Sequence, residues 1–595
     1  MTPTVQVPAC VFVTVLLLGG PASMTAQDRP RAIRRSDVVF MYDNPKLYET
    51  YGCTALGWAG RADAGHIARA HAKGVRQFSC SVGFLTEFRR VIDFSDDYLD
   101  AACRNFAGKP FIVPWLWDHK HKGQPAWWWC TNSPLYRKYL DARLVEVMKA
   151  KPDGLHIDDY RGTSGCVTWL SGCFCRHCLA GFRKYLAEHV AKDKLTALGI
   201  KDLGSFDYRK FLLARGVTPA DYKKRRSRLP LAKEFHHFHV MAATQVVAEY
   251  YRRAKALRGA ELSLSVNSGL GDPQAIVIAP HLSYFCCEVG HGAATRRVPD
   301  GPVSIYKLAD GLNRPVASTA SGHDWAFIAE NKLPGLVRTW TALSYAFGHT
   351  LMAPHRQWCY TKAKGTHWYA GPTEAYAPLH RFIRTNAALL DDYEAVAPVA
   401  VIYDNAARRA GRGRIRVICT DLARANVPFR VLVAGDDWLA YRLKATDLAG
   451  ARAVVAPKGV QLNGDQGKLL DRAAQQGKLV PWPDKAALEK LIGTPVAVKG
   501  AKGVWAVPRA VPGDQSRPVV IHLLNRNYDK DADAMVVQKN LTLRLSRDLF
   551  AGRKFTAATA HAPKAKPVKL TVASDAKTTT IAIPSLELWT MIELK

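Results

Sequence analysis

The sequence predicts an α/β protein: a (β/α)₈ TIM barrel, a small doubly wound α/β domain of the flavodoxin type, and a C-terminal β-sandwich. Short apolar runs alternate with helical patterns up to residue 395, which is typical of parallel βα units. A second, shorter αβ rhythm begins at residue 396. From residue 496, strand patterns follow one another without helices between them, which favours a sandwich.

Eight apolar runs supply the predicted barrel strands. They begin near residues 38, 75, 109, 154, 261, 282, 314 and 349. Functional residues of such barrels lie at the carboxyl ends of the strands. The connection after the fourth run is about a hundred residues long and holds a cysteine-rich loop, so we expect an insertion at that face.

The apolar runs and the alternation of strand and helix patterns also set the expected domain boundaries. We expect the barrel over residues 27–395, the α/β domain over 396–495 and the β-sandwich over 496–595. The α/β domain contains no G-x-G-x-x-G pattern, so no nucleotide is expected there.

The first residues suggest export. Residues 1–26 combine an apolar run with small residues near Ala22 and Ala26, which predicts a signal peptide and a secreted or periplasmic protein. An uncleaved anchor is the alternative reading. No later stretch is long and apolar enough to span a membrane, so we expect no membrane contact after cleavage.

The formal net charge of +32 first suggests nucleic acid as a partner, because Lys and Arg neutralise phosphates. The basic residues are dispersed, however, and no nucleic-acid motif or polybasic tail accompanies them. We therefore expect a solvated basic surface and no nucleic-acid partner. An acidic polysaccharide is the alternative, since a positive field concentrates sulfated or uronic chains.

A cysteine cluster predicts a metal site. Cys173, Cys175 and Cys178 form a C-x-C-x-x-C motif, which brings three thiols into one loop. Tetrahedral zinc needs a fourth ligand from elsewhere in the sequence. Cys130 is the best candidate and Cys166 the reserve, while a disulfide is the alternative outcome.

Two segments resemble glycoside hydrolase family 42, the β-galactosidases. That family carries "C-x-N-S-P-x-Y-R" after the third strand and "C-x-C-x-x-C…F-R-x-[WY]-L" after the fourth. The matching positions here are Cys130, Asn132, Ser133, Pro134, Tyr136 and Arg137, then Cys173, Cys175, Cys178, Phe182, Arg183, Tyr185 and Leu186. The resemblance implies a structural Zn²⁺ on Cys130, Cys173, Cys175 and Cys178. It also implies an amidotransferase-like trimerisation domain, so a homo-oligomer, trimer or dimer, is expected.

The resemblance does not extend to the catalytic glutamates. At the end of the fourth strand this chain reads "HIDDYRG", so Tyr160 stands where the family places its acid/base Glu. The seventh strand, "VASTASGHDW", lacks the nucleophile Glu as well. "HIDDY" resembles other glycosidase-like barrels instead. Any catalytic pair must therefore have moved, or the barrel does not catalyse.

Acidic residues near strand ends offer a replacement pair. Glycoside hydrolysis needs one carboxyl to protonate the leaving oxygen and another to attack or to activate water. Asp158 and Asp159 end the fourth strand and Glu288 ends the sixth. A fourth-strand Asp nucleophile with a sixth-strand acid resembles family 66 dextranases. Because successive strand residues point to opposite faces, at most one of the two Asp residues should face the mouth.

Other residues after strand ends are predicted to bind substrate. Aromatic rings suit sugar stacking, and polar groups suit sugar hydroxyls or an anionic substituent. The predicted substrate-binding residues are Trp117, Asp118, Tyr160, His323, Asp324, Trp325, His355, Arg356 and Trp358. Of these, Trp117, Tyr160, Trp325 and Trp358 are expected to line one aromatic cleft.

These observations favour a retaining glycoside hydrolase that acts on an oligo- or polysaccharide substrate, with Asp158 or Asp159 as nucleophile and Glu288 as acid/base. The rival is a non-catalytic, carbohydrate-binding pseudo-glycosidase, which the loss of both family 42 glutamates favours. Carboxylates that converge on an open cleft would support catalysis, whereas carboxylates turned into salt bridges would support binding alone.

Overall fold

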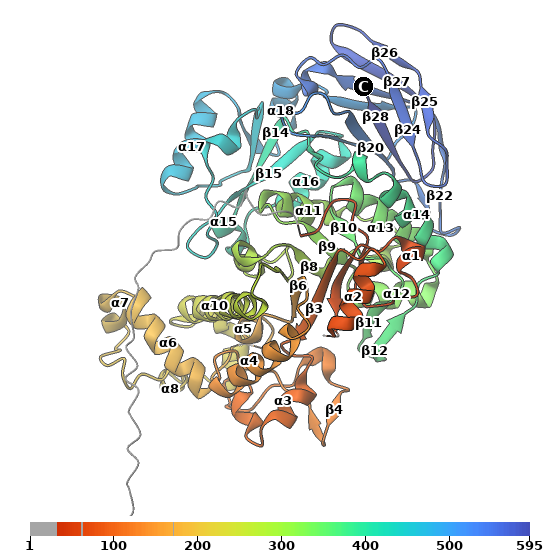
Figure 1. Ribbon diagram of the computed structural model, residues 1–595. Helices are drawn as coiled ribbons and strands as arrows, with labels where there is room; N and C mark the ends of the chain where they lie inside the picture. The colour runs from red at the N-terminus through yellow and green to blue at the C-terminus, as the bar shows by residue number, and fades with distance from the viewer. Residues whose placement is uncertain (1–31, 61–62, 171) are drawn as a thin grey trace, which may run out of the picture. The chain divides into compact units, whose positions relative to one another are not determined.

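The structure, a computed structural model, describes residues 32–60, 63–170 and 172–595. The predicted signal peptide of residues 1–26 lies outside this range. Within it, helices and strands alternate up to residue 385, and strands dominate after residue 496 (Figure 1).

Eight parallel strands form the first part of the chain. Five belong to one sheet in the order β1-β2-β3-β6-β7 and three to another in the order β8-β9-β10. Two backbone bonds join the sheets into a closed ring: Ser283 N to Leu264 O, and Ala353 N to Val39 O. The strands are β1 (Val39–Phe40), β2 (Ala55–Ala59), β3 (Gln77–Gly83), β6 (Gly154–Asp158), β7 (Ser263–Val266), β8 (Phe285–Glu288), β9 (Val316–Thr319) and β10 (Thr350–Leu351).

The predicted third strand is wrong. The run from residue 109 forms isolated bridges and the short helix η2 (Pro114–Leu116), whereas the chain inserts β2 between the first two predicted strands. The run is apolar because residues such as Val113 and Leu116 are buried, although they belong to no barrel strand. The segment "ALGWA" of β2 is small and weakly patterned, yet it is buried throughout. The two errors offset each other, so the numbering of later strands is unchanged.

Helices surround the ring of strands (Figure 1). They are α2 (Ala64–Ala72), α4 (Pro134–Met148), α5 (Gly162–Leu170), α10 (Ala232–Arg258), α11 (Gly301–Gly311), α12 (Gly322–Asn331), α13 (Pro334–Ala346) and α14 (Thr373–Thr385). Helix α6 (Arg176–His189) packs on α10 instead. Local sequence fixes several of their starts. Ser133 caps α4 by accepting from Tyr136 N, with Pro134 in the first turn, and Ser321 caps α12 in the same way.

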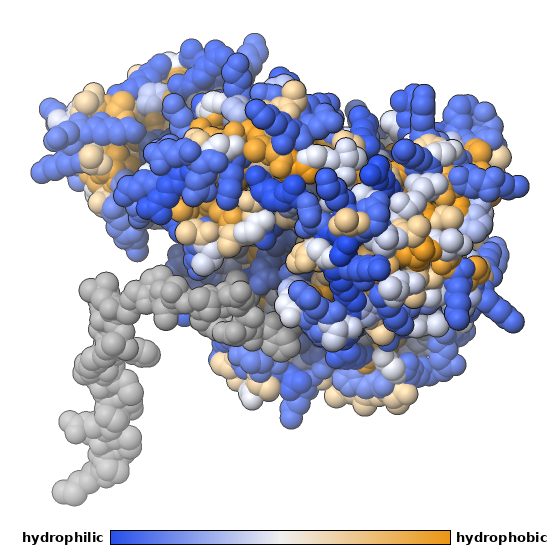
Figure 2. Space-filling view, turned by 90° about the horizontal axis from the view of Figure 1, so that it is seen from above, coloured by the Kyte–Doolittle hydropathy of each residue, from blue (hydrophilic) through white to orange (hydrophobic). Residues whose placement is uncertain are grey.

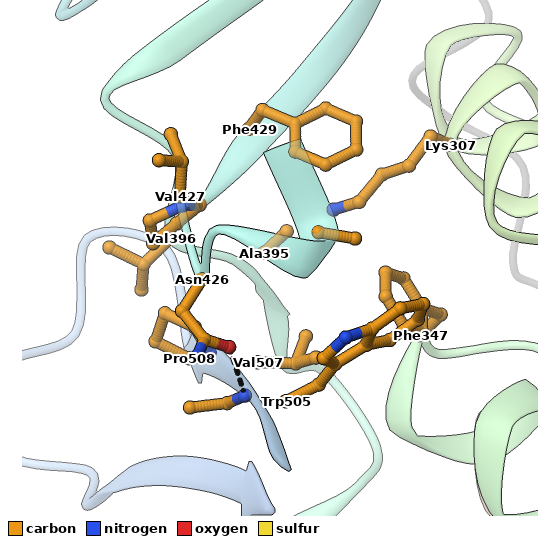
Figure 3. A pocket seen from close by; sticks show the side chains of 13 residues that line it. Lys307, Phe347, Ala395, Val396, Asn426, Val427, Phe429, Trp505, Val507 and Pro508 are labelled. Atoms are coloured by element: carbon orange, nitrogen blue, oxygen red, sulfur yellow. Dashed lines mark hydrogen bonds between the residues drawn. The ribbon is translucent and has the colours of Figure 1, made fainter. Parts of the chain in front are cut away.

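A four-stranded parallel sheet follows, in the order β15-β14-β16-β17. Its strands are β14 (Val399–Asp404), β15 (Phe429–Ala434), β16 (Ala453–Pro457) and β17 (Leu479–Trp482), with helices α16 (Ile415–Arg424), α17 (Gly464–Gln475) and α18 (Lys485–Ile492). Lys307 of α11 points into a small apolar pocket beside Phe429 of β15 (Figure 3). Its ammonium group lies 5.0 Å from that ring and 5.5 Å from the ring of Phe347, and burial lowers its pKa to about 8.

The C-terminal part holds two antiparallel sheets that share one apolar core. The larger sheet contains β13 (Glu394–Ala395), β19 (Val504–Ala510), β20 (Val519–Asn525), β28 (Trp589–Leu594), β24 (Ala558–His561) and β25 (Val568–Leu570). The smaller contains β18 (Val496–Lys499), β23 (Gln538–Ser546), β27 (Thr578–Leu586) and β26 (Val572–Ser574). Strand β13 precedes the parallel sheet in sequence but pairs with β19, so the chain returns to this region.

Two surface properties bear on the sequence predictions. Hydrophilic residues cover most of the face seen in Figure 2, as a solvated charged surface requires. Within the described ranges, no helix combines the length and the apolar character needed to cross a membrane.

Candidate active site

A cavity of about 720 Å³ lies at the carboxyl ends of the barrel strands. Each of the eight strands, or the loop that follows it, contributes to the lining. The aromatic lining residues are Tyr42, Trp58, Trp115, Trp169, Trp358, Tyr360 and Trp368. Rings of this kind beside a few carboxylates are the composition expected of a site for a ligand with both apolar faces and hydroxyl groups.

Asp158 ends β6 and lies in this cavity. The Asn267 side chain donates to its Oδ1 at 3.1 Å, and the Trp58 indole and the backbone of Asp159 also hydrogen-bond to it. Burial raises its pKa to about 6, while these three donors oppose the rise. Asp158 therefore keeps a negative charge at neutral pH despite its surroundings.

Asp159 also lines the cavity, so the expectation that only one of the two Asp residues faces the mouth is wrong. The strand ends at Asp158, and Asp159 adopts a left-handed backbone with φ of 52°. That conformation breaks the alternation of an extended strand and turns the second side chain to the same side. Burial, then the charges of Asp158 and Glu288, raise the pKa of Asp159 well above its usual range.

Glu288 ends β8 and completes the group of carboxyls. The backbone N–H of Gly322, in the first turn of α12, donates to Glu288 Oε1 at 3.2 Å. Burial, and then the charge of Asp158, raise the pKa of Glu288 to about 7. The Arg296 guanidinium, which follows in the same loop, donates to Asn331 Oδ1 at 2.7 Å.

The three carboxyls thus share one cavity but differ in pKa. The pKa of Asp158 is raised to about 6 and that of Glu288 to about 7, and the pKa of Asp159 is raised well above its usual range. An ionised carboxylate beside a protonated one is the combination that acid/base or nucleophilic chemistry needs.

The structure brings some predicted substrate-binding residues to the cavity and leaves others elsewhere. His323 and Trp358 line it, and Trp358 packs on Gly322, where a side chain would collide with its ring. Arg356 lies outside the lining, but its guanidinium stacks on Trp368 at 4.3 Å.

Four of the predicted substrate-binding residues do not line the cavity, because their side chains form hydrogen bonds within the protein. The Tyr160 hydroxyl donates to Ala275 O at 2.8 Å, and the Trp325 indole donates to Thr319 Oγ1 at 2.8 Å. His355 is buried against the carbonyls of Ala353 and Tyr42. The fourth, Asp324, accepts from the backbone N–H of His291 and of Ala293, which anchors the loop after β8.

Trp117 and Asp118 do not line the cavity either. Trp117 is 50% exposed, and Asp118 pairs with His119 at 3.0 Å. Both lie in the loop that was assigned to a strand, so their predicted positions at a strand end were wrong.

Sequence reasoning missed several lining residues. Asn267 directly follows strand β7 and Tyr42 lies two residues after strand β1, so their positions near strand ends were available as a signal. Trp58 belongs to the strand that was not predicted. Trp169 and Trp368 lie in a helix and in a hairpin, where no strand-end pattern marks them.

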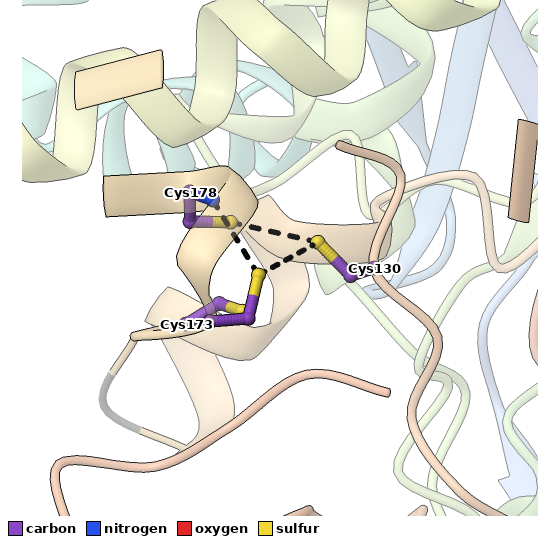
Figure 4. A group of neighbouring side chains, drawn as sticks. Cys130, Cys173 and Cys178 are labelled. Carbon is purple, nitrogen blue, oxygen red and sulfur yellow. Dashed lines mark hydrogen bonds between the residues drawn. The ribbon is translucent and has the colours of Figure 1, made fainter. Parts of the chain in front are cut away.

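A second group of side chains lies apart from the carboxyls. The sulfur atoms of Cys130, Cys173, Cys175 and Cys178 all lie within 4.8 Å of one another and are buried (Figure 4). Cys130 Sγ is 3.5 Å from both Cys175 Sγ and Cys178 Sγ, far beyond the roughly 2.05 Å of a disulfide. The reserve candidate, Cys166, lies outside the group and contacts Gly172 O at 3.8 Å.

The surroundings of the four thiols fit a metal. The Asn132 side chain donates to Cys178 Sγ at 3.4 Å, and Cys178 N donates to Cys175 Sγ at the same distance, where α6 begins. N–H donors directed at sulfur stabilise thiolates, which are the form that binds metals. Four converging thiols with such donors suit a tetrahedral ion.

Comparisons with known proteins begin with sequence. No family model matches the chain. An α-agarase from Thalassotalea agarivorans is 25% identical over 496 residues, which are 80% of this chain and 33% of that protein. An α-agarase from Alteromonas agarilytica is 23% identical over 536 residues, or 87% of this chain and 36% of the relative. The chain thus spans about a third of the length of these curated relatives.

Solved structures show that the fold is one used by glycosidases. A β-galactosidase from Bacillus circulans sp. alkalophilus has a TM-score of 0.62 at 12% identity, over 94% of this chain and 99% of that one. Alpha-L-fucosidase isoenzyme 2 from Paenibacillus thiaminolyticus has a TM-score of 0.60 at 12% identity, over 95% of this chain and 100% of that one. By fold the chain is glycosidase-like, and by sequence it is related to α-agarases. Membership of family 42 stays a prediction.

Proposed function

We propose that the protein is a retaining glycoside hydrolase that cleaves a neutral polysaccharide of the agar type. The observation that carries the proposal is the group of three carboxyls, with unequal proton affinities, in an aromatic cavity at the strand ends. The sequence relation to α-agarases supports agar as the substrate. The glycosidase fold supports the reaction class.

Asp158 serves as the nucleophile and Glu288 as the acid/base in this proposal. Asp158 is the more acidic of the two and accepts several hydrogen bonds, so it is the one ionised at neutral pH. Glu288, with a pKa near 7, gives its proton to the leaving oxygen and later takes one from water. A retaining reaction needs their carboxyls about 5–5.5 Å apart. Asp159, the third carboxyl of the cavity, forms a hydrogen bond to substrate in this proposal.

A neutral substrate suits the charges in the cavity. Among the described lining residues there is no Lys or Arg, while Asp158, Asp159, Glu288 and Glu87 are all acidic. An anionic group close to the carboxyls would be repelled, because the cavity screens charge poorly. The basic residues behind the net charge of +32 thus lie outside this lining. A sulfated or uronic sugar is therefore not favoured at the point of cleavage.

The proposal is tested by incubating the purified full chain with agar and, separately, with a sulfated galactan, and measuring new reducing ends. We expect release from agar and at least ~10-fold slower release from the sulfated polymer. A chain that binds agar without releasing reducing ends would support the pseudo-glycosidase rival. Faster cleavage of the sulfated polymer would contradict the charge argument.

The four-cysteine group is proposed to hold a structural Zn²⁺. Cys130 comes from the loop before α4, Cys173 and Cys175 from the loop before α6, and Cys178 from the first turn of α6. The ion would therefore tie together two segments that are distant in the sequence. Its chemistry would be to fix this loop, since four thiolates leave no open coordination position. Oligomer formation and export stay predictions.

A further inference from the structure

A smaller cavity of about 210 Å³ adjoins the main one. Both are lined by Trp115, Trp169, Asp159, Asn267 and Glu288, so the two spaces meet at the carboxyls. Asp158 is different, because it lines the main cavity and not the side cavity. A volume below the roughly 300 Å³ of typical small-molecule pockets suits a single sugar ring.

The side cavity has an exposed aromatic wall on a fixed support. Trp169 of α5 is 60% exposed, and its ring meets the edge of Trp115 at 5.4 Å. Trp115 in turn meets Trp128 at 5.4 Å, and the Trp128 indole donates to Gly162 O at 2.8 Å. The inner rings are therefore held in place, while the outer one presents a large apolar face to solvent. A ring that lines a cavity beside a few polar groups suits stacking on a ligand.

The wall of the side cavity also includes an arginine side chain, whose charge is balanced by an ion pair. Arg161 lies in its wall and pairs with Asp272 at 3.1 Å. Such a pair offers hydrogen-bond donors and acceptors to hydroxyl groups without selecting an anion. The lining thus fits a neutral sugar ring stacked on tryptophan.

We infer that this side cavity is the leaving-group subsite and that Trp169 is its stacking platform; the inference rests on the proposed function. In a retaining reaction the nucleophile faces the anomeric carbon, and the proton donor faces the oxygen that departs. Asp158 lines only the main cavity, so the sugar that becomes attached to the enzyme lies there. Glu288 faces both spaces, so the departing sugar lies in the side cavity, against Trp169.

The test compares two substrates in the Trp169→Ala variant. An agar oligosaccharide places a sugar in the side cavity, whereas the fluoride of the same glycone has no leaving sugar. We expect Trp169→Ala to lower kcat/KM for the oligosaccharide at least ~10-fold and to change that for the fluoride less than ~2-fold. Trp169→Phe, which keeps a ring, should recover most of the loss.

Trp117→Ala is the matched control, because Trp117 is 50% exposed and lines neither cavity. It should change neither substrate's kinetics. Equal losses on both substrates would place Trp169 on the glycone side and overturn the inference, as would no loss on either. If the wild-type chain cleaves neither substrate, the proposed function itself fails, which is a different result. Thermal unfolding of each variant shows whether the fold is intact.

Discussion

Asp158→Asn is expected to lower turnover of agar by at least ~10³-fold while leaving the fold intact. The substitution keeps the shape of the side chain and removes the negative charge that attacks the anomeric carbon. Asp159→Asn is the matched control, because Asp159 adjoins Asp158 in the same cavity, and burial and the charges of Asp158 and Glu288 disfavour its ionised form. We expect a loss below ~10-fold for the control. The reverse order of losses would make Asp159 the nucleophile.

Glu288→Gln should lower turnover by about 10²–10⁴-fold and change its pH dependence. Activity needs Asp158 ionised, so kcat/KM should fall as the pH drops through about 6. It also needs Glu288 protonated, so kcat/KM should fall as the pH rises through about 7. The variant should lose the alkaline limb only. A bell-shaped profile that persists in Glu288→Gln would assign the acid to another group.

Loss of the metal is the other change with a large expected effect. Freshly purified protein should contain one Zn²⁺ per chain by elemental analysis, and Cys130→Ser should lose the ion. Because binding free energy at such a site is folding free energy, we expect the melting temperature to fall by about 10 °C or more. Chelation should likewise lower the melting temperature before it lowers activity, since the ion does not touch the carboxyls.

Cys166→Ser is the control for this experiment. Cys166 is buried close by but outside the group of four, so its replacement should keep the zinc. If Cys130→Ser kept the zinc and Cys166→Ser lost it, Cys166 and not Cys130 would be the fourth ligand. Protein purified without any metal would contradict the zinc site.

The sequence was informative where chemistry depends on spacing. The C-x-C-x-x-C motif and Cys130 converge in the structure, because residue spacing and a shared loop bring the thiols together. Asp158 and Glu288 could be placed in one cavity because the carboxyl ends of parallel strands meet at one face. Seven of the eight strands were also found, since their apolar runs are buried on both faces.

The sequence was uninformative where the outcome depends on how a side chain turns after a strand ends. Tyr160 and Trp325 follow strands but turn into the interior, where backbone or threonine oxygens accept from them. Asp159 turns to the mouth only through its left-handed backbone. Trp169 and Trp368 reach the cavity from a helix and a hairpin whose positions depend on tertiary packing.

The most direct test of the account is to trap the covalent intermediate. Glu288→Gln is incubated with an agar-oligosaccharide fluoride, because fluoride leaves without a proton while the missing base slows hydrolysis of the intermediate. After acid quenching, peptide mapping by mass spectrometry should find the sugar on the carboxyl of Asp158. A sugar on Asp159, or fluoride release with no labelled peptide, would contradict Asp158 as the nucleophile of a retaining glycoside hydrolase.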